Sequence, residues 1–220
     1  IVPGGSAQLT FATGVAESRE QALHLADRYR DPEAAARAFA MAWTQCQVEL
    51  RHLNISAADA QRFQRLAAAV LYMDGAKRAR PEVLERNVKG QPGLWAYGIS
   101  GDEPIVVVQV EAGDDLSLVR ELIQAHQYWR LKRLAVDLVI VNEHAGGYLQ
   151  GVQDQILGLV RSSGSSAWLN QRGGIFTLRA DMLPADDLAL LQTVARVLLS
   201  TRRGGVGQHL RRRAPDPAVP

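Results

Sequence analysis

Residues 105–110 read IVVVQV, an almost unbroken run of branched apolar side chains. A strand of this composition is typical of a parallel sheet covered by helices on both faces, because neither face tolerates polar residues. Another β-prone run, Leu94–Ile99, precedes it, and the intervening Ser100–Pro104 has the residues of a turn. These residues predict two buried strands joined by a turn and place the chain in the α/β class.

The segments that follow alternate between the two periodicities of secondary structure. Strand-like runs are separated by stretches with apolar residues at helical spacing, which favours crossover connections between parallel strands. Residues 93–203 are therefore predicted to form a small, mostly parallel sheet flanked by helices. The expected elements are a helix at Leu116–Lys132, a strand at Leu134–Val141, a helix at Tyr148–Arg161, a strand at Gly174–Arg179 and a helix at Pro184–Ser200.

An N-terminal helical layer is predicted over residues 17–73. Three helix starts are marked by capping residues, at Ser18, at Asp31 before Pro32, and at Ser56 with Asp59 three positions later. Before them, residues 1–16 are expected to form a terminal strand, centred on Ser6–Val15, whose pairing partners lie upstream.

Two further segments have the composition of connections. Residues 74–92 contain Gly, Pro and charged residues and are predicted to connect the helical layer to the α/β domain, with at most a short helix at Pro81–Asn87. Residues 204–220 form a basic, Pro-rich linker, and Arg211–Pro220 is predicted to be disordered.

Composition argues against several classes of function. The net charge is only +2, and the excess Arg residues belong to one tail, so we expect no nucleic-acid partner. The single cysteine, Cys46, rules out an internal disulfide and a multi-Cys metal site, and it is predicted to be a buried, inert thiol.

No run reaches the roughly 18 apolar residues of a membrane span, and no signal-peptide pattern opens the chain. His and acidic residues lack metal-ligand spacing and no dinucleotide fingerprint is present, so no metal or cofactor is expected.

Polar residues follow the predicted strand at Leu134–Val141. Asn142, Glu143 and His144 lie at the carboxyl end of that strand, where open α/β sheets bind ligands. Ala145-Gly146-Gly147 then opens a helix whose N–H groups could meet an anion. Glu143 is a candidate base with His144 as its proton partner. The alternative is that these residues are loop polars that cap the helix.

Aromatic and acidic residues in the first part of the α/β domain are the other candidates. Trp95 and Tyr97 could form a sugar-stacking platform together with Tyr128, Trp129 and Trp168, although such aromatics are more often core residues. Asp102 and Glu103 are neighbouring carboxylates in a turn and are expected to be solvated. His126 belongs to an apolar helical stripe and is predicted to be a core histidine.

Several stretches together resemble the cyclic β-1,2-glucan synthase family. The resemblance covers nearly the whole chain, and its most specific part is the ten-residue motif GLWAYGISGD. The stretches that carry it are FATGVAESRE at 11–20, QVELRHL at 47–53, GLWAYGISGD at 93–102, HQYWR at 126–130, DLVIVNE at 137–143, and YLQ at 148–150 through Asp154-Gln155.

The resemblance implies a position within a large membrane-bound protein of the bacterial inner membrane. The chain would be a connector on the cytoplasmic side, after a β-sandwich and ahead of a cellobiose-phosphorylase-like half. The parent would transfer glucosyl units from UDP-glucose, cyclise the glucan and control its length by phosphorolysis. The family's catalytic residues belong to regions outside this sequence, so the resemblance assigns no catalytic residue here.

Three hypotheses follow. In the first, the chain is a non-catalytic module that positions neighbouring domains of the same polypeptide or grips β-1,2-glucan, with Trp95, Tyr97 and Asp102 as candidate contacts. In the second, the α/β domain has its own carbohydrate- or anion-binding or catalytic site at Glu143 and His144, with Asn142 beside them. In the third, the chain is a structural spacer.

Overall fold

The computed structural model describes residues 2–7, 9–111, 115–144 and 149–211. The predicted linker at Arg211–Pro220 therefore lies almost entirely outside the described residues. Contacts divide the chain into two compact units, residues 1–54 and residues 55–220. The division falls between Asn54 and Ile55, whereas the sequence led us to expect a boundary at 74–92.

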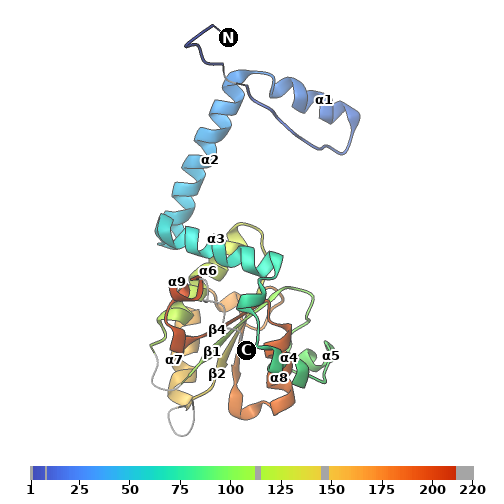
Figure 1. Ribbon diagram of the computed structural model, residues 1–220. Helices are drawn as coiled ribbons and strands as arrows, with labels where there is room; N and C mark the ends of the chain where they lie inside the picture. Colours follow the sequence, from blue (N-terminus) through green and yellow to red (C-terminus); the bar gives the residue numbers. More distant parts are fainter. Residues whose placement is uncertain (1, 8, 112–114, 145–148, 212–220) are drawn as a thin grey trace. The chain divides into compact units, whose positions relative to one another are not determined.

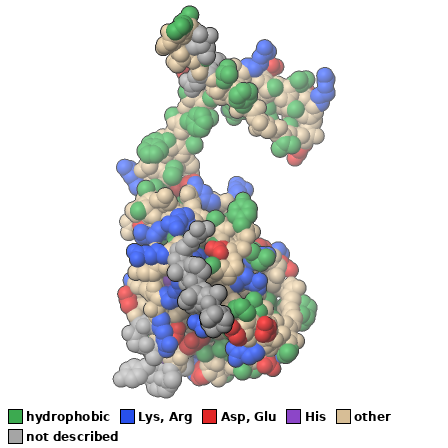
Figure 2. Space-filling model, viewed as in Figure 1, with side chains coloured by type: hydrophobic (Ala, Val, Ile, Leu, Met, Phe, Trp, Pro, Cys, Tyr) green, Lys and Arg blue, Asp and Glu red, His purple; other side chains and the backbone are tan. Residues whose placement is uncertain are grey.

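The first unit contains two helices, α1 (Arg19–Arg28) and α2 (Pro32–Leu53) (Figure 1). Both predicted caps are confirmed. Ser18 accepts a hydrogen bond from the amide of Gln21 at 3.2 Å, and Asp31 accepts one from the amide of Glu33 at 2.9 Å. Phe39 and Trp43 are exposed on this unit. Figure 2 shows hydrophobic side chains on its surface.

The strand predicted at Ser6–Val15 is not formed by the described residues of that segment. An isolated strand cannot pair its own backbone groups, and Leu9, Phe11 and Val15 are all exposed. Its assignment to an upstream sandwich stays a prediction. Cys46 is half-buried in α2 and not fully buried as expected.

The second unit begins with α3 (Ala57–Tyr72), which starts at the predicted capping box of Ser56 and Asp59. Short helical segments η1 (Gly75–Lys77), α4 (Pro81–Arg86) and α5 (Pro92–Trp95) follow. The remaining elements are β1 (Ile105–Val110), α6 (Ser117–Leu131), β2 (Asp137–Asn142), α7 (Leu149–Ser162), η3 (Ser166–Trp168), β3 (Ile175–Arg179), η4 (Ala180–Met182), α8 (Ala185–Val194), β4 (Val197–Ser200), η5 (Thr201–Arg203) and α9 (Val206–His209).

The four strands form a parallel sheet in the order β3-β2-β1-β4. The chain adds β2 and then β3 on one side of β1, and it later adds β4 on the other side of β1. Because crossovers are right-handed, α6 and α7 cover one face and α8 the other, where α4 and α5 pack against it (Figure 1). The predicted α/β class and the burial of Ile105–Val110 on both faces are confirmed.

Two predicted elements are wrong. Leu94–Ile99 is not a strand, because Pro92 starts the short helix α5 and Gly98 then takes a positive φ of 72°. Leu94 and Ile99 are nevertheless buried, in the core between α8 and the sheet.

The helix predicted at Pro184–Ser200 ends at Val194, and Val197–Ser200 forms β4. The free edge of β1 offers backbone partners to this apolar segment, and the Arg196 amide already donates to the carbonyl of Ile105 at 2.8 Å. Tertiary pairing thus overrides the local helical pattern. The described part of the expected linker at 204–220 also belongs to the fold, since Val206 and His209 of α9 are buried.

Candidate functional site

The six candidate residues lie at opposite ends of the sheet. Trp95, Tyr97 and Asp102 precede β1, whereas Asn142 ends β2 and is followed by Glu143 and His144. Six-residue strands are about 20 Å long. The two sets therefore belong to different regions, and the structure does not combine them into one site.

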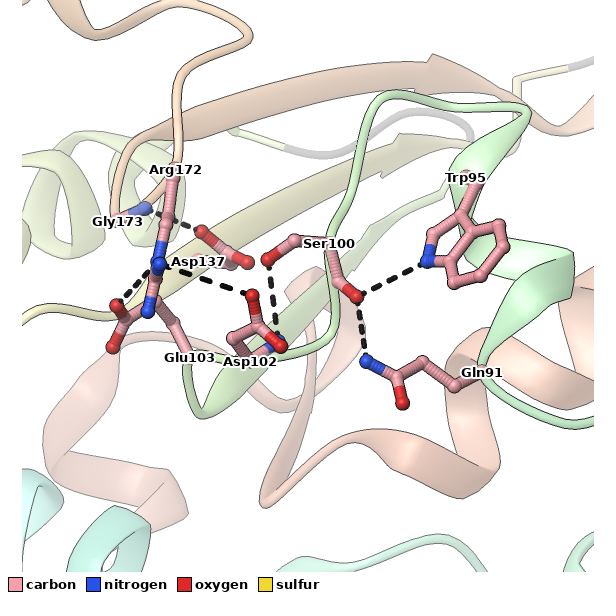
Figure 3. Close-up of polar contacts among 8 residues, drawn as sticks. All are labelled: Gln91, Trp95, Ser100, Asp102, Glu103, Asp137, Arg172 and Gly173. Carbon is pink, nitrogen blue, oxygen red and sulfur yellow. Dashed lines mark hydrogen bonds and ion pairs between the residues drawn. The ribbon is translucent and has the colours of Figure 1, made fainter.

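The loop before β1 is organised around one backbone carbonyl. The carbonyl oxygen of Ser100 accepts a hydrogen bond from Gln91 Nε2 at 2.8 Å and another from the indole Nε1 of Trp95 at 3.3 Å (Figure 3). The Ser100 hydroxyl accepts one from the amide of Asp102 at 3.2 Å. Gly101, with φ of 77°, makes this approach possible, because a Cβ there would lie 2.9 Å from Gln91 Cγ. The loop is thus a folded unit with fixed side chains.

Trp95 is the exposed aromatic of this loop, with 61% of its surface accessible. Next to the loop lies an open hollow of about 500 Å³, whose wall includes Leu94 and Asp102 from the motif and Gln91 from just before it. Arg78 and Arg196 contribute positive charge to the same wall. This combination of apolar surface and a few polar groups suits a small polar ligand.

An arginine bridges the two acidic residues of the turn. Arg172 donates from Nε to Glu103 Oε1 at 2.8 Å, and its Nη1 lies 3.8 Å from Asp102 Oδ2 (Figure 3). The neighbouring Asp137 at the start of β2 is buried and accepts from the amide of Gly173 at 2.7 Å. Burial, with a smaller effect from the Glu103 charge, raises the pKa of Asp137 to about 6.

Tyr97 is half-buried, and its hydroxyl donates to Asp187 Oδ2 at 2.7 Å in the first turn of α8. Lys89 Nζ donates to the other oxygen of the same carboxylate at 2.5 Å. Burial and the Asp187 carboxylate raise the pKa of Tyr97 to about 12. Its polar end therefore serves to anchor the loop to α8.

At the carboxyl end, the polar side chains make local hydrogen bonds. Asn142 Oδ1 accepts from the His144 amide at 3.1 Å, and Asn142 Nδ2 donates to Gln153 at 3.3 Å. Gln109 Nε2 donates to Glu143 Oε1 at 2.6 Å. Burial raises the pKa of Glu143. The predicted anion contact at Ala145-Gly146-Gly147 lies outside the described residues.

Tyr128, Trp129 and His126 belong to the core, whereas Trp168 is half-buried. Tyr128 and Trp129 are buried, and Trp168 lies under the guanidinium of Arg130. His126 Nε2 contacts the carbonyls of Val136 at 3.1 Å and Gly173 at 3.0 Å, so this nitrogen carries the proton. The prediction of a core histidine is confirmed.

Sequence reasoning missed Gln91 and Arg172 as parts of the loop. Gln91 directly precedes the motif, and its position before a proline at a helix start was the available signal. Arg172 lies 69 positions from Glu103, and no local pattern relates the two. Among the described residues, no group of three His, Cys, Asp or Glu is arranged to hold a metal ion.

No family model matches the chain. It is 33% identical over 215 residues to the cyclic beta-(1,2)-glucan synthase NdvB of Rhizobium meliloti (strain 1021). The chain resembles a segment of a cyclic β-1,2-glucan synthase. The match covers 96% of this chain but only 8% of that synthase. The resemblance inferred from the motifs is thereby confirmed.

None of the helices within the described ranges is both long and apolar enough to cross a membrane. The match covers 8% of the synthase, so this chain corresponds to about one twelfth of the protein for which the activity is named.

Proposed function

We propose that this chain is a non-catalytic segment of a cyclic β-1,2-glucan synthase that contacts glucan at the loop before β1. The observation that supports the proposal most directly is the exposure of Trp95 in the loop whose Leu94 and Asp102 line the open hollow. Aromatic rings can stack on the apolar faces of sugars, and the exposed indole of Trp95 offers such a surface.

The surroundings of Trp95 suit a carbohydrate. The indole N–H is already bonded to Ser100, so the ring is held in place and loses little freedom when a sugar stacks on it. Gln91 and Asp102 in the hollow can hydrogen bond to sugar hydroxyls. Arg78 and Arg196 supply further donors from the same hollow.

A binding role suits these groups better than catalysis does. Glycosyl transfer and phosphorolysis use a carboxyl group free to donate a proton to the leaving oxygen. Here the carboxylates of Asp102 and Glu103 both lie against the guanidinium of Arg172, and Asp137 is buried below the surface. The motif therefore supports a scaffold that holds a sugar in place.

The wider setting of this proposal is the synthase as a whole. In it, the segment would lie between domains of one polypeptide at the cytoplasmic side of the bacterial inner membrane. Those domains would transfer glucosyl units from UDP-glucose and trim chains in a phosphorylase-like reaction. The segment would hold nascent glucan between these activities.

Two measurements test the proposal. Titration of linear and cyclic β-1,2-glucans into the 220-residue chain, followed by calorimetry, is expected to give saturable binding. Absence of binding at millimolar glucan would favour a structural spacer instead. Incubation of the chain with glucan and inorganic phosphate is expected to release no glucose 1-phosphate, and its appearance would contradict the non-catalytic assignment.

A further inference from the structure

The order of the strands defines a topological switch point between β1 and β4. The connections from β1 lead away to β2 and β3, and the chain then returns to place β4 on the other side of β1. In open α/β sheets, ligands bind outside the carboxyl ends of strands at such a point, where the loops diverge. This location lies at the other end of the strands from Trp95, so its ligand is tested separately from glucan, although Arg78 lines both this hollow and the one beside the motif loop.

A hollow of about 300 Å³ lies at this switch point. Gln109 of β1 and Ser200 of β4 contribute from the sheet, close to the carboxyl ends of both strands. Residues 76–80 form a second wall across from β4, and Arg203 of η5 follows shortly after the strand. The volume lies at the lower end of the range for small-molecule sites and suits a compact ligand.

The lining of this hollow carries charge of one sign. Its charged residues are Lys77, Arg78, Arg80 and Arg203, and none of the residues that line it, all within the described ranges, is acidic. Arg78 donates from Nη2 to the carbonyl of Thr193 at 2.8 Å. Lys77, Arg80 and Arg203 form no ion pair with an acid in the described part of the chain. Three cations thus gather in a concave surface, and none of them has an acidic partner among the described residues.

Acidic side chains near the hollow have other partners, and Asp74 accepts a hydrogen bond from the Ala76 amide at the start of η1. Glu111 forms an ion pair with Arg202 and accepts a hydrogen bond from the Ser200 hydroxyl at 2.7 Å. Glu143 accepts from Gln109. His209 adds no positive charge of its own: it contacts the Ser200 carbonyl through Nε2 at 3.0 Å, and burial, with the nearby Arg203 and Lys77 charges, lowers its pKa. The field in the hollow therefore stays positive near neutral pH.

We propose that the hollow at the β1/β4 switch point binds a phosphate group, free or esterified to a small molecule, through Lys77, Arg80 and Arg203. A phosphate carries nearly two negative charges at neutral pH and presents several acceptor oxygens, which match the lysine and arginine donors. Converging cations in a concavity also raise the local concentration of anions. Gln109 and the Ser200 hydroxyl border the same space and can contact the ester group.

The test compares two variants that each lose two positive charges. In Arg80→Gln/Arg203→Gln the cations of the hollow are removed, and in Arg120→Gln/Arg161→Gln two exposed arginines of α6 and α7 are removed. Inorganic phosphate and ribose 5-phosphate are titrated into each chain by calorimetry at constant ionic strength near neutral pH, with chloride as the reference anion. Thermal unfolding of each variant confirms that it remains folded.

We expect saturable phosphate binding by the unsubstituted chain and by the α6/α7 control variant. Binding by Arg80→Gln/Arg203→Gln should be weaker by roughly tenfold or more, because charge-assisted hydrogen bonds are lost. Lys77→Gln, which leaves both arginines in place, should weaken it by a smaller factor. Tighter binding of ribose 5-phosphate than of inorganic phosphate would support an ester as the ligand, and the reverse order would support free phosphate.

Three results would overturn the proposal. The first is a dissociation constant above about 10 mM for both probes. The second is an equal loss of affinity in the two double variants, which would reflect net charge alone. The third is equal binding of chloride and phosphate.

Discussion

The hydroxyl of Tyr97 donates a 2.7 Å hydrogen bond to Oδ2 of Asp187, which joins the loop before β1 to the first turn of α8. Lys89 holds the other carboxylate oxygen, so two residues of the segment before β1 meet at one acidic residue at least 90 positions further along the chain. The loop that carries Trp95 is therefore anchored to the helix that covers the sheet, and its geometry depends on this contact.

Tyr97→Phe should lower the free energy of unfolding by about 1–2 kcal/mol, because it removes a hydrogen bond to a charged acceptor. Urea unfolding measures the change. Tyr72→Phe is the matched control, since Tyr72 is 84% exposed and its hydroxyl should contribute little. Equal effects of the two substitutions would contradict the anchoring role.

Gly101→Ala should destabilise the chain by about 1–2 kcal/mol, because φ is 77° and the new methyl would meet the Gln91 side chain. Gly158→Ala in α7 provides the opposite control. No atom lies within 4 Å of the position that its methyl group would take, and alanine favours the helix by about 0.5–1 kcal/mol. Chemical unfolding should shift in opposite directions for the two variants. A stabilising Gly101→Ala would show that the loop adopts another conformation.

Asp137 should make the chain less stable as pH rises from about 4 to 6. Its pKa in the folded chain is raised from 3.8 to about 6, so the folded state holds a proton that the unfolded state releases in this interval. Relative to Asp137→Asn, the unsubstituted chain should lose up to about 1.4 kcal/mol per pH unit there. Urea unfolding across this pH range gives the comparison, and parallel profiles would contradict the raised pKa.

His126 should have the opposite effect on the pH dependence of the unfolding free energy, over nearly the same pH interval. Burial lowers its pKa from 6.5 to about 4, so the unfolded state takes up a proton first as pH falls. Relative to His126→Gln, the unsubstituted chain should lose stability as pH falls from about 6.5 to 4. Both groups contact the backbone of Gly173, through its amide and its carbonyl. Each single variant removes one of these two pH-dependent contributions. The change in unfolding free energy caused by Asp137→Asn and the change caused by His126→Gln should therefore vary with pH in opposite directions, and variation in the same direction would contradict this assignment.

Local patterns in the sequence predict much of the fold. The caps at Ser18, Asp31 and Ser56 and the apolar run at Ile105–Val110 act through near neighbours, and the structure forms each predicted element there. The errors arise where distant partners decide. Val197–Ser200 pairs with β1 although its own pattern continues a helix, and Leu94 and Ile99 are buried by α8 without strand pairing.

The sites were harder to predict for the same reason. The sequence indicates that Trp95 and Asp102 belong to one motif, but Arg172 reaches that motif from before β3. The hollow at the switch point depends on β4, which the sequence pattern concealed, and its cations come from residues 77–80 and 203. Their meeting follows from strand order, which no local spacing encodes.

The most direct test of the glucan proposal compares Trp95→Ala with Trp43→Ala, since both residues are exposed tryptophans but only Trp95 belongs to the motif loop. Linear β-1,2-glucan is titrated into each 220-residue chain by calorimetry, with thermal unfolding as a check of folding. We predict that Trp95→Ala weakens binding by roughly tenfold, as expected for an aromatic contact of about 1.4 kcal/mol, while Trp43→Ala binds as the unsubstituted chain does. Unchanged glucan affinity in Trp95→Ala would contradict the proposal.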